Sequence, residues 1–166
     1  MSVQHEGRVL ITPSQVDYAA LTPSMIAELD LDGRGGRNPS SERAVHLAIY
    51  RARPDVRAII HAHPVQACAL AVLGEPLPAI LDEVGPVLGG VVAVAEYAPS
   101  GSAELGESAV AALANRNAVL LANHGSVTVG ESLGKALYRL EVLERTAQIY
   151  LLARLLGKPR TVPERV

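Results

Sequence analysis

The feature that most constrains the fold is a helical repeat of apolar residues across positions 131–156. Apolar side chains recur there with the 3.6-residue period of an α-helix, and Gly157 follows as a C-cap. Such a helix has one apolar face, which it must bury against another layer of secondary structure. We therefore expect a layered α/β or α+β domain with this long helix at its carboxyl end.

Shorter patterns predict the remaining elements. Three more helices are expected at residues 42–53, 65–73 and 101–115, with Ser40 or Ser41 as the N-cap of the first. Strands of mixed direction are expected at residues 7–12, 26–31, 56–62, 90–95 and 118–129, the last interrupted at 123–125. With 166 residues and no internal repeat, the chain is expected to form one domain, residues 1–166.

Charge and cysteine content exclude several classes of protein. The net charge is -2, and no run of Lys or Arg is long enough to form a nucleic-acid-binding stripe. We also expect no membrane association, since the chain shows neither a secretory signal nor an apolar run of spanning length. The single cysteine, Cys68, suits a reducing compartment and hence the cytoplasm. Because 49% of residues are hydrophobic, contacts between subunits are expected as well.

Histidines provide the main chemical signal. His61 and His63 are two residues apart in a predicted strand, so both imidazoles lie on one face and can reach the same ion. A catalytic zinc site takes three protein ligands, and His124, before Gly125 at the end of an apolar strand, is the third candidate. His-X-His pairs also occur without a metal, and His124 alone is compatible with a strand-end cap.

Polar residues at the start of the first helix are a second candidate site. Glu42 lies where the helix dipole favours a carboxylate, and helix-end electrostatics alone would explain it. His46 is one turn further on the same face and is interpreted as structural, with a Glu42 ion pair as the alternative. Ser40 and Ser41 combine hydroxyls with free backbone N–H groups, an arrangement that suits either phosphate binding or ordinary N-capping.

Taken together, three blocks of the sequence resemble the class II aldolase/adducin family, and within it the L-fuculose-phosphate aldolase branch. The blocks are ITPSQVDYAALTPSMI, PSSERAVHLAIYRARPDVRAIIHAHP and LLANHGSVTVG, the last followed by a long helix. They occur in the family's order, and the spacing from Glu42 to His61 is also the one that the family has. The resemblance covers the chain from about Ser2 to its end.

The resemblance implies a three-layer α/β/α fold around a mainly antiparallel sheet, assembled as a homotetramer with active sites between subunits. It implies that His61, His63 and His124 bind Zn2+, or Mn2+ or Co2+ through the same ligands, and that Glu42 is the acid/base residue. It also implies phosphate binding by four residues that match the family's two phosphate loops: Ser40, Ser41, Ser14 and Gln15.

Some family features differ in this sequence. Gln15 stands where the family has glycine, and the amino-terminal helix and Gly-Asn phosphate loop of the family would precede Ser2, so weak phosphate affinity is expected. Asp82 stands where the family carries a tyrosine donated across the interface. We therefore expect Asp82 or Glu83 of a neighbouring subunit to replace that tyrosine as the proton donor.

The activity implied is retro-aldol cleavage of a ketose or ketose phosphate through a metal-stabilised enediolate. The same chemistry serves related sugar-phosphate epimerases, dehydratases and decarboxylases. A non-catalytic oligomeric member of the family is a further alternative. The expected partner is a small sugar or sugar phosphate.

Overall fold

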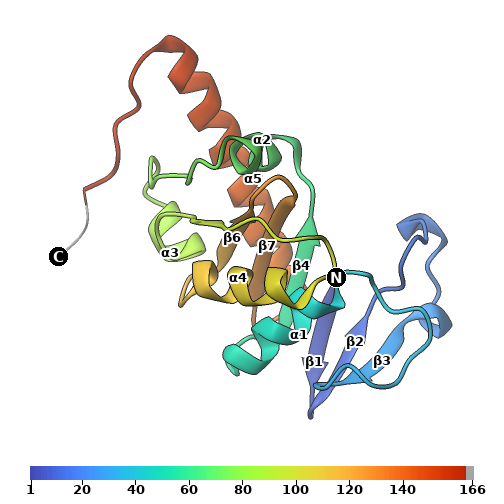
Figure 1. Ribbon diagram of the computed structural model, residues 1–166. Coiled ribbons are helices and arrows are strands. Elements are labelled where there is room, and N and C mark those ends of the chain that lie inside the picture. The colour runs from blue at the N-terminus through green and yellow to red at the C-terminus, as the bar shows by residue number, and fades with distance from the viewer. Residues whose placement is uncertain (164–166) are drawn as a thin grey trace.

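The computed structural model describes residues 1–163, which form a seven-stranded sheet covered by helices on both faces (Figure 1). The strand order is β3-β2-β1-β4-β7-β6-β5. Five neighbouring pairs are antiparallel and one, β5 with β6, is parallel, so the sheet is mixed. The strands are β1 (Ser2–His5), β2 (Arg8–Ile11), β3 (Ala27–Asp30), β4 (Ala58–Ala62), β5 (Val94–Ala95), β6 (Ala118–Leu121) and β7 (Gly125–Gly130).

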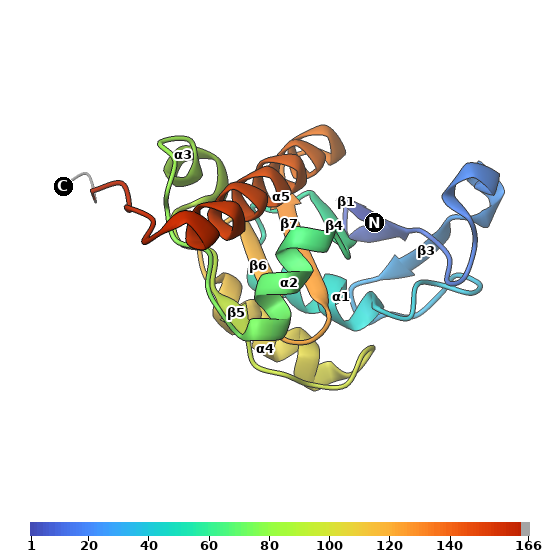
Figure 2. The same ribbon diagram turned by 90° about the horizontal axis from the view of Figure 1, so that it is seen from above.

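The helices form the two outer layers, as the view from above shows most clearly (Figure 2). Helices α1 (Arg43–Ala52) and α4 (Ala103–Leu113) pack on one face, and α2 (Val65–Leu73), α3 (Val84–Leu88) and α5 (Leu133–Leu156) pack on the other. Two short 3-10 helices, η1 (Tyr18–Ala20) and η2 (Pro23–Met25), lie in the connection from β2 to β3. The expected three-layer α/β/α fold is confirmed. Within residues 1–163, none of the helices has the length and apolar character needed to span a membrane.

The central strands are covered on both faces, and their sequences reflect this. Every residue of β6 and β7 is buried: β6 is a continuous apolar run, whereas β7 buries Ser126 and Thr128 between apolar residues. Alternation is found instead in β2 and β3, where only every second side chain enters the core. One large apolar cluster fills the space between the sheet and α1 and α4, and a second fills the space between the sheet and the helices of the other face.

The predicted elements agree with most of the structure, with five differences. The prediction for residues 65–73 matches α2, which Gly74 ends in the left-handed conformation, and α5 begins two residues later than expected. Two elements were missed, β1 with its polar sequence and the short α3. The expected strand at residues 90–95 is paired only at Val94–Ala95, and the one at 118–129 is a hairpin of two strands.

Helices α1 and α4 approach closely because Gly106 lies between them. A Cβ atom added at Gly106 would lie 3.0 Å from both the Ala44 carbonyl oxygen and the Ala48 Cβ. The small side chains at these positions let the two backbones nearly touch. This contact holds α1, and with it Glu42 at its amino end, against the sheet.

Replacing Gly106 with leucine should therefore force the two helices apart and lower the free energy of unfolding by about 1 to 3 kcal/mol, the usual range for overpacking. Urea unfolding followed by circular dichroism measures the effect. Gly134→Ala is the matched control, because this exposed helical glycine has only the Ser132 hydroxyl, at 3.9 Å, near an added Cβ. Equal stability of the Gly106→Leu variant and the wild type would contradict the close packing.

Candidate metal centre and the cavity around it

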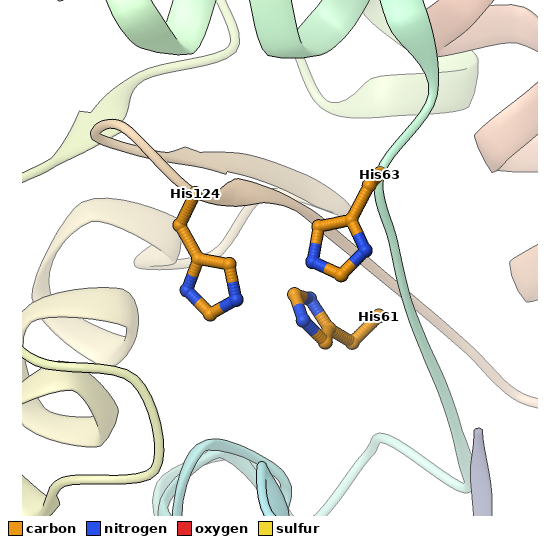
Figure 3. A group of neighbouring side chains, drawn as sticks. All are labelled: His61, His63 and His124. Atoms are coloured by element: carbon orange, nitrogen blue, oxygen red, sulfur yellow. The ribbon is translucent and has the colours of Figure 1, made fainter. Parts of the chain in front are cut away.

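Three histidines from two neighbouring segments converge where the central strands β4 and β7 meet at one end of the sheet (Figure 3). His61 is in β4, His63 follows the end of that strand, and His124 lies in the turn between β6 and β7. One ring nitrogen of each lies within 4.8 Å of those of the other two. The three residues predicted as metal ligands are thus brought together in space from two segments that are well separated in the sequence.

His61 has the bonding pattern of a metal ligand. Its Nδ1 lies 3.0 Å from the carbonyl oxygen of Ser126. A carbonyl can only accept, so Nδ1 carries the proton and Nε2 keeps its lone pair. That Nε2 is buried and has no hydrogen-bond partner among the described residues. A buried lone pair without a partner is unfavourable unless a cation binds there, so the cluster fits a divalent ion.

The protonation of the cluster supports the same interpretation. Burial lowers the pKa of His61 to about 4, and the charges of the other two histidines act in the same direction. Burial also lowers the pKa of His124, against the opposing charge of Glu42. Both rings are therefore neutral near pH 7, which is the form that binds metals.

Gly125 is required by the close approach of His63. A Cβ atom at this position would lie 2.6 Å from Cδ2 of His63 and 2.8 Å from the carbonyl oxygen of Ala62. A larger residue would push the His63 ring out of the cluster. The glycine after His124 thus has a packing role in the centre, as its place in the sequence indicated.

Glu144 supports His63 from the long helix α5, and sequence reasoning missed it. Its two carboxylate oxygens accept hydrogen bonds from the backbone N–H groups of Gln66 and Ala67, at 2.9 Å each. These donors are at the start of α2, just after His63 and Pro64. Glu144 therefore caps α2 and fixes the chain that carries His63.

Glu42 lines the same cavity as the three histidines, and the cavity has a volume of about 620 Å³. Its side chain is buried and both oxygens accept hydrogen bonds, Oε1 from the Ser100 hydroxyl and Oε2 from the Gly101 N–H at 3.2 Å. It is not part of the histidine cluster itself. Glu42 is the N-cap residue of α1, yet its side chain makes no capping bond, so helix-end capping does not account for its position.

The four residues predicted to bind phosphate also line this cavity. The Ser40 hydroxyl accepts a hydrogen bond from the Glu42 N–H at 3.2 Å, and Ser41 is exposed. The expectation that one of these serines is the N-cap of α1 was wrong, because the helix begins later, with Glu42 as its N-cap. Ser14 and Gln15 lie on the connection from β2, and Gln15 has a φ of 58°. That left-handed conformation favours glycine, the residue that the family has there. The two phosphate-loop candidates are thus brought together.

His46 is buried in α1, which agrees with its interpretation as a structural residue. Its ring is 1% exposed, and Nδ1 lies 2.7 Å from the Ser2 hydroxyl, which also contacts the Tyr50 hydroxyl. The partner of His46 is thus Ser2, and the alternative of an ion pair with Glu42 is not what the described residues show. Burial is the main cause that lowers the pKa of His46 well below its ordinary value.

Asp82 and Glu83 lie away from the histidine cavity of their own chain. Asp82 lines a different cavity, and Glu83 precedes α3 and accepts hydrogen bonds from Arg145 on α5, the shorter at 2.9 Å. Neither joins the three histidines within one chain. A role for them in the site therefore requires a neighbouring subunit.

Residues 1–151 match the model of the family described as the class II aldolase and adducin N-terminal domain. The chain belongs to this family. It is 39% identical to the L-fuculose phosphate aldolase of Escherichia coli strain K12, over 91% of this chain and 71% of the relative. It is 37% identical to the 5-deoxy-D-ribulose 1-phosphate aldolase of Bacillus thuringiensis, over 97% of this chain and 76% of the relative.

A solved structure of an L-fuculose 1-phosphate aldolase superposes on the chain with a TM-score of 0.95 and 42% identity, over 98% of this chain and 79% of that one. The resemblance inferred from the three sequence blocks is thereby confirmed. So is the prediction of a lyase of the class II aldolase type, since the named relatives are aldolases. Class II aldolases are metal-dependent, which agrees with a histidine cluster suited to a cation.

Single replacements of His61, His63 or His124 by alanine should each reduce bound metal well below one ion per chain, since a three-ligand site loses a third of its donors. Metal analysis after reconstitution and desalting measures this. His46→Ala is the matched control, because it should lower stability and leave the metal content unchanged. Retention of a full equivalent of metal in any of the three cluster variants would remove that residue from the site.

The stability of the metal-free protein should depend on pH through His46. In the unfolded chain its pKa is 6.5 and in the folded chain it is far lower, so the unfolded state binds one more proton in between. The free energy of unfolding therefore falls as pH falls below 6.5, and His46 contributes about 1.4 kcal/mol per pH unit to that slope.

Replacing His46 with asparagine should remove that contribution from the slope, while the contributions of His61 and His124 remain. Urea unfolding in the presence of a chelator, at several values between about pH 6.5 and 4.5, measures it. His5→Asn is the control, because His5 is exposed. An unchanged slope in the His46→Asn variant would show that this ring is accessible to protons in the folded state.

Proposed function

We propose that this chain is a divalent-metal aldolase that cleaves a ketose 1-phosphate by a retro-aldol reaction. The observation that carries the proposal is one cavity lined by the unpaired Nε2 of His61, the other two histidines, the Glu42 carboxylate and the serines of two loops. The names of the relatives point to the substrate class, since they act on L-fuculose 1-phosphate and 5-deoxy-D-ribulose 1-phosphate.

We propose Zn2+ as the ion, held by His61, His63 and His124, because three imidazole nitrogens suit it; Mn2+ and Co2+ can use the same ligands. A bound ion supplies positive charge that stabilises the negative charge left on the ketose oxygens when the carbon–carbon bond breaks. The walls of the cavity, which include Glu42 and the three histidines, would hold the substrate in place.

Glu42 is the residue that moves a proton in this proposal. Its carboxylate is buried beside the cluster and borders the cavity, where it can accept a proton from a substrate hydroxyl. Ser40, Ser41, Ser14 and Gln15 lie together on two loops and would receive the phosphate through hydroxyl and backbone donors. The Ser40 hydroxyl accepts a hydrogen bond from the Glu42 N–H, which leaves its own proton available for the phosphate, and the hydroxyl proton of the exposed Ser41 is available as well.

We further propose a homotetramer with active sites between subunits, acting in the cytoplasm. Large apolar side chains are exposed on α2 and the end of α5, including Val65, Leu73 and Leu156 at 73%, 63% and 92%. Burying such a surface against another copy of the chain would be favourable.

Such an assembly would also let Asp82 or Glu83 reach a neighbouring cavity as the proton donor. A carboxyl group would need a raised pKa to donate near neutral pH.

The test is a substrate screen of the metal-loaded protein. L-Fuculose 1-phosphate, 5-deoxyribulose 1-phosphate and the two unphosphorylated ketoses are compared, and the release of dihydroxyacetone phosphate and of the aldehyde are followed separately. Equal release of both products from a phosphorylated ketose supports the proposal. Turnover of a phosphorylated ketose without release of dihydroxyacetone phosphate would favour an epimerase, dehydratase or decarboxylase, and no turnover of any substrate would favour a non-catalytic member.

Glu42→Gln should lower kcat by about 100- to 10,000-fold, since the amide keeps the shape but cannot accept a proton. Its metal content and melting temperature should stay close to those of the wild type, because the histidines are untouched. Glu28→Gln is the control, an exposed glutamate on β3. A near wild-type rate in the Glu42→Gln variant would remove Glu42 from the mechanism.

A further inference from the structure

Helix α2 contacts both segments that carry the histidine cluster. It begins two residues after His63, so its first turn continues the chain of that ligand. The turn that carries His124 meets the same helix at two points. The Asn123 N–H donates to the carbonyl oxygen of Ala71 at 3.2 Å. The Cys68 thiol donates to the carbonyl oxygen of His124, with 3.8 Å between sulfur and oxygen. A shift of α2 would therefore move the two ligand segments relative to each other.

The amino end of α2 is a positive pole beside the histidine cluster. The first N–H groups of a helix have no partner within it, and together they act as a charge of roughly +0.5. Two residues of chain keep the Cα atom of Val65, the first residue of α2, within about 7 Å of the Cα atom of His63. A cation held by His63 would therefore meet an unfavourable field unless the pole is neutralised.

Glu144 of α5 neutralises this pole. Its two carboxylate oxygens accept hydrogen bonds from the N–H groups of Gln66 and Ala67, at 2.9 Å each. The N-cap residue of α2 is Pro64, whose side chain makes no capping bond, so the helix depends on Glu144 for its cap. The charge of Glu144 acts within the helix as well, because it adds to the burial that raises the pKa of the Cys68 thiol.

We propose that Glu144 is a positioning residue of the metal centre and acts on the ion through α2. Its charge offsets the positive pole next to His63, and its two hydrogen bonds fix the helix that both ligand segments contact. Glu144 is not a member of the histidine cluster itself. The inference rests on the proposed metal site, and it does not depend on which reaction the ion serves.

Glu144→Gln is the variant that tests the charge. It keeps the shape of the side chain, but it removes the negative charge and turns one of the two acceptors into an NH2 group. Co2+ is the probe, and its affinity is measured by competition with a chelator. We expect Glu144→Gln to bind Co2+ about tenfold more weakly, or ~1.4 kcal/mol, as for a charge at a partly buried helix end. Glu144→Asp keeps the charge near the pole and should recover part of the affinity.

Two further measurements separate positioning from a general loss of stability. Ser132→Ala is the control, because it removes the cap of α5 itself, where the Ser132 hydroxyl accepts from the Lys135 N–H at 3.2 Å. It should lower the melting temperature and leave Co2+ affinity unchanged. The visible spectrum of bound Co2+ should keep its band positions in Glu144→Gln, since the three ligands are the same.

Wild-type Co2+ affinity in Glu144→Gln would overturn the inference, and so would an equal loss of affinity in Ser132→Ala. A Glu144→Asp variant as weak as Glu144→Gln would remove the role of the charge. Shifted Co2+ bands in Glu144→Gln would show that Glu144 is a ligand and not a positioning residue. Absence of Co2+ binding by the wild type would overturn both the metal site and this inference. Absence of aldol cleavage alone would overturn only the proposed reaction.

Discussion

The antiparallel pairing of β4 with β7 is the interaction on which the rest of the site depends. Its register places His61 opposite Val127 and Ala62 opposite Ser126. That register lets the Ser126 carbonyl accept the hydrogen bond that orients the His61 ring, and it brings His63 beside Gly125. His124 precedes that glycine, so one strand pair gathers all three imidazoles. A shift by one residue would turn His61 to the other face of the sheet.

The site places neutral nitrogen donors next to a separately held carboxylate. Burial keeps His61 and His124 uncharged, which leaves lone pairs for a cation but makes the empty cluster unfavourable. Glu42 supplies negative charge nearby, and its position is determined by a different segment of the chain.

Both helical layers contribute to this arrangement. On one face, α1 carries Glu42, and the packing of α4 on α1 through Gly106 brings the Ser100–Gly101 segment to the carboxylate. On the other face, Glu144 of α5 caps α2 directly after His63. The site therefore lies at one end of the central strands, with residues of both helical layers beside it. Changes far from the cavity, in either layer, are expected to reach it.

Local patterns in the sequence were sufficient for the elements with strong periodicity and for the histidines. The α2 and α5 helices, the His61–His63 pair and the turn at His124 were all predicted, because spacing along a strand or helix is a local property. The sequence did not reveal β1, whose polar residues gain a strand conformation by pairing with β2 and β4. Nor did it reveal Ser100, Gly101 and Glu144, because each meets its partner across 58 or more residues. Hydrogen bonds of that range depend on how the layers pack, so only the tertiary structure decided which donors hold Glu42 and what fixes His63.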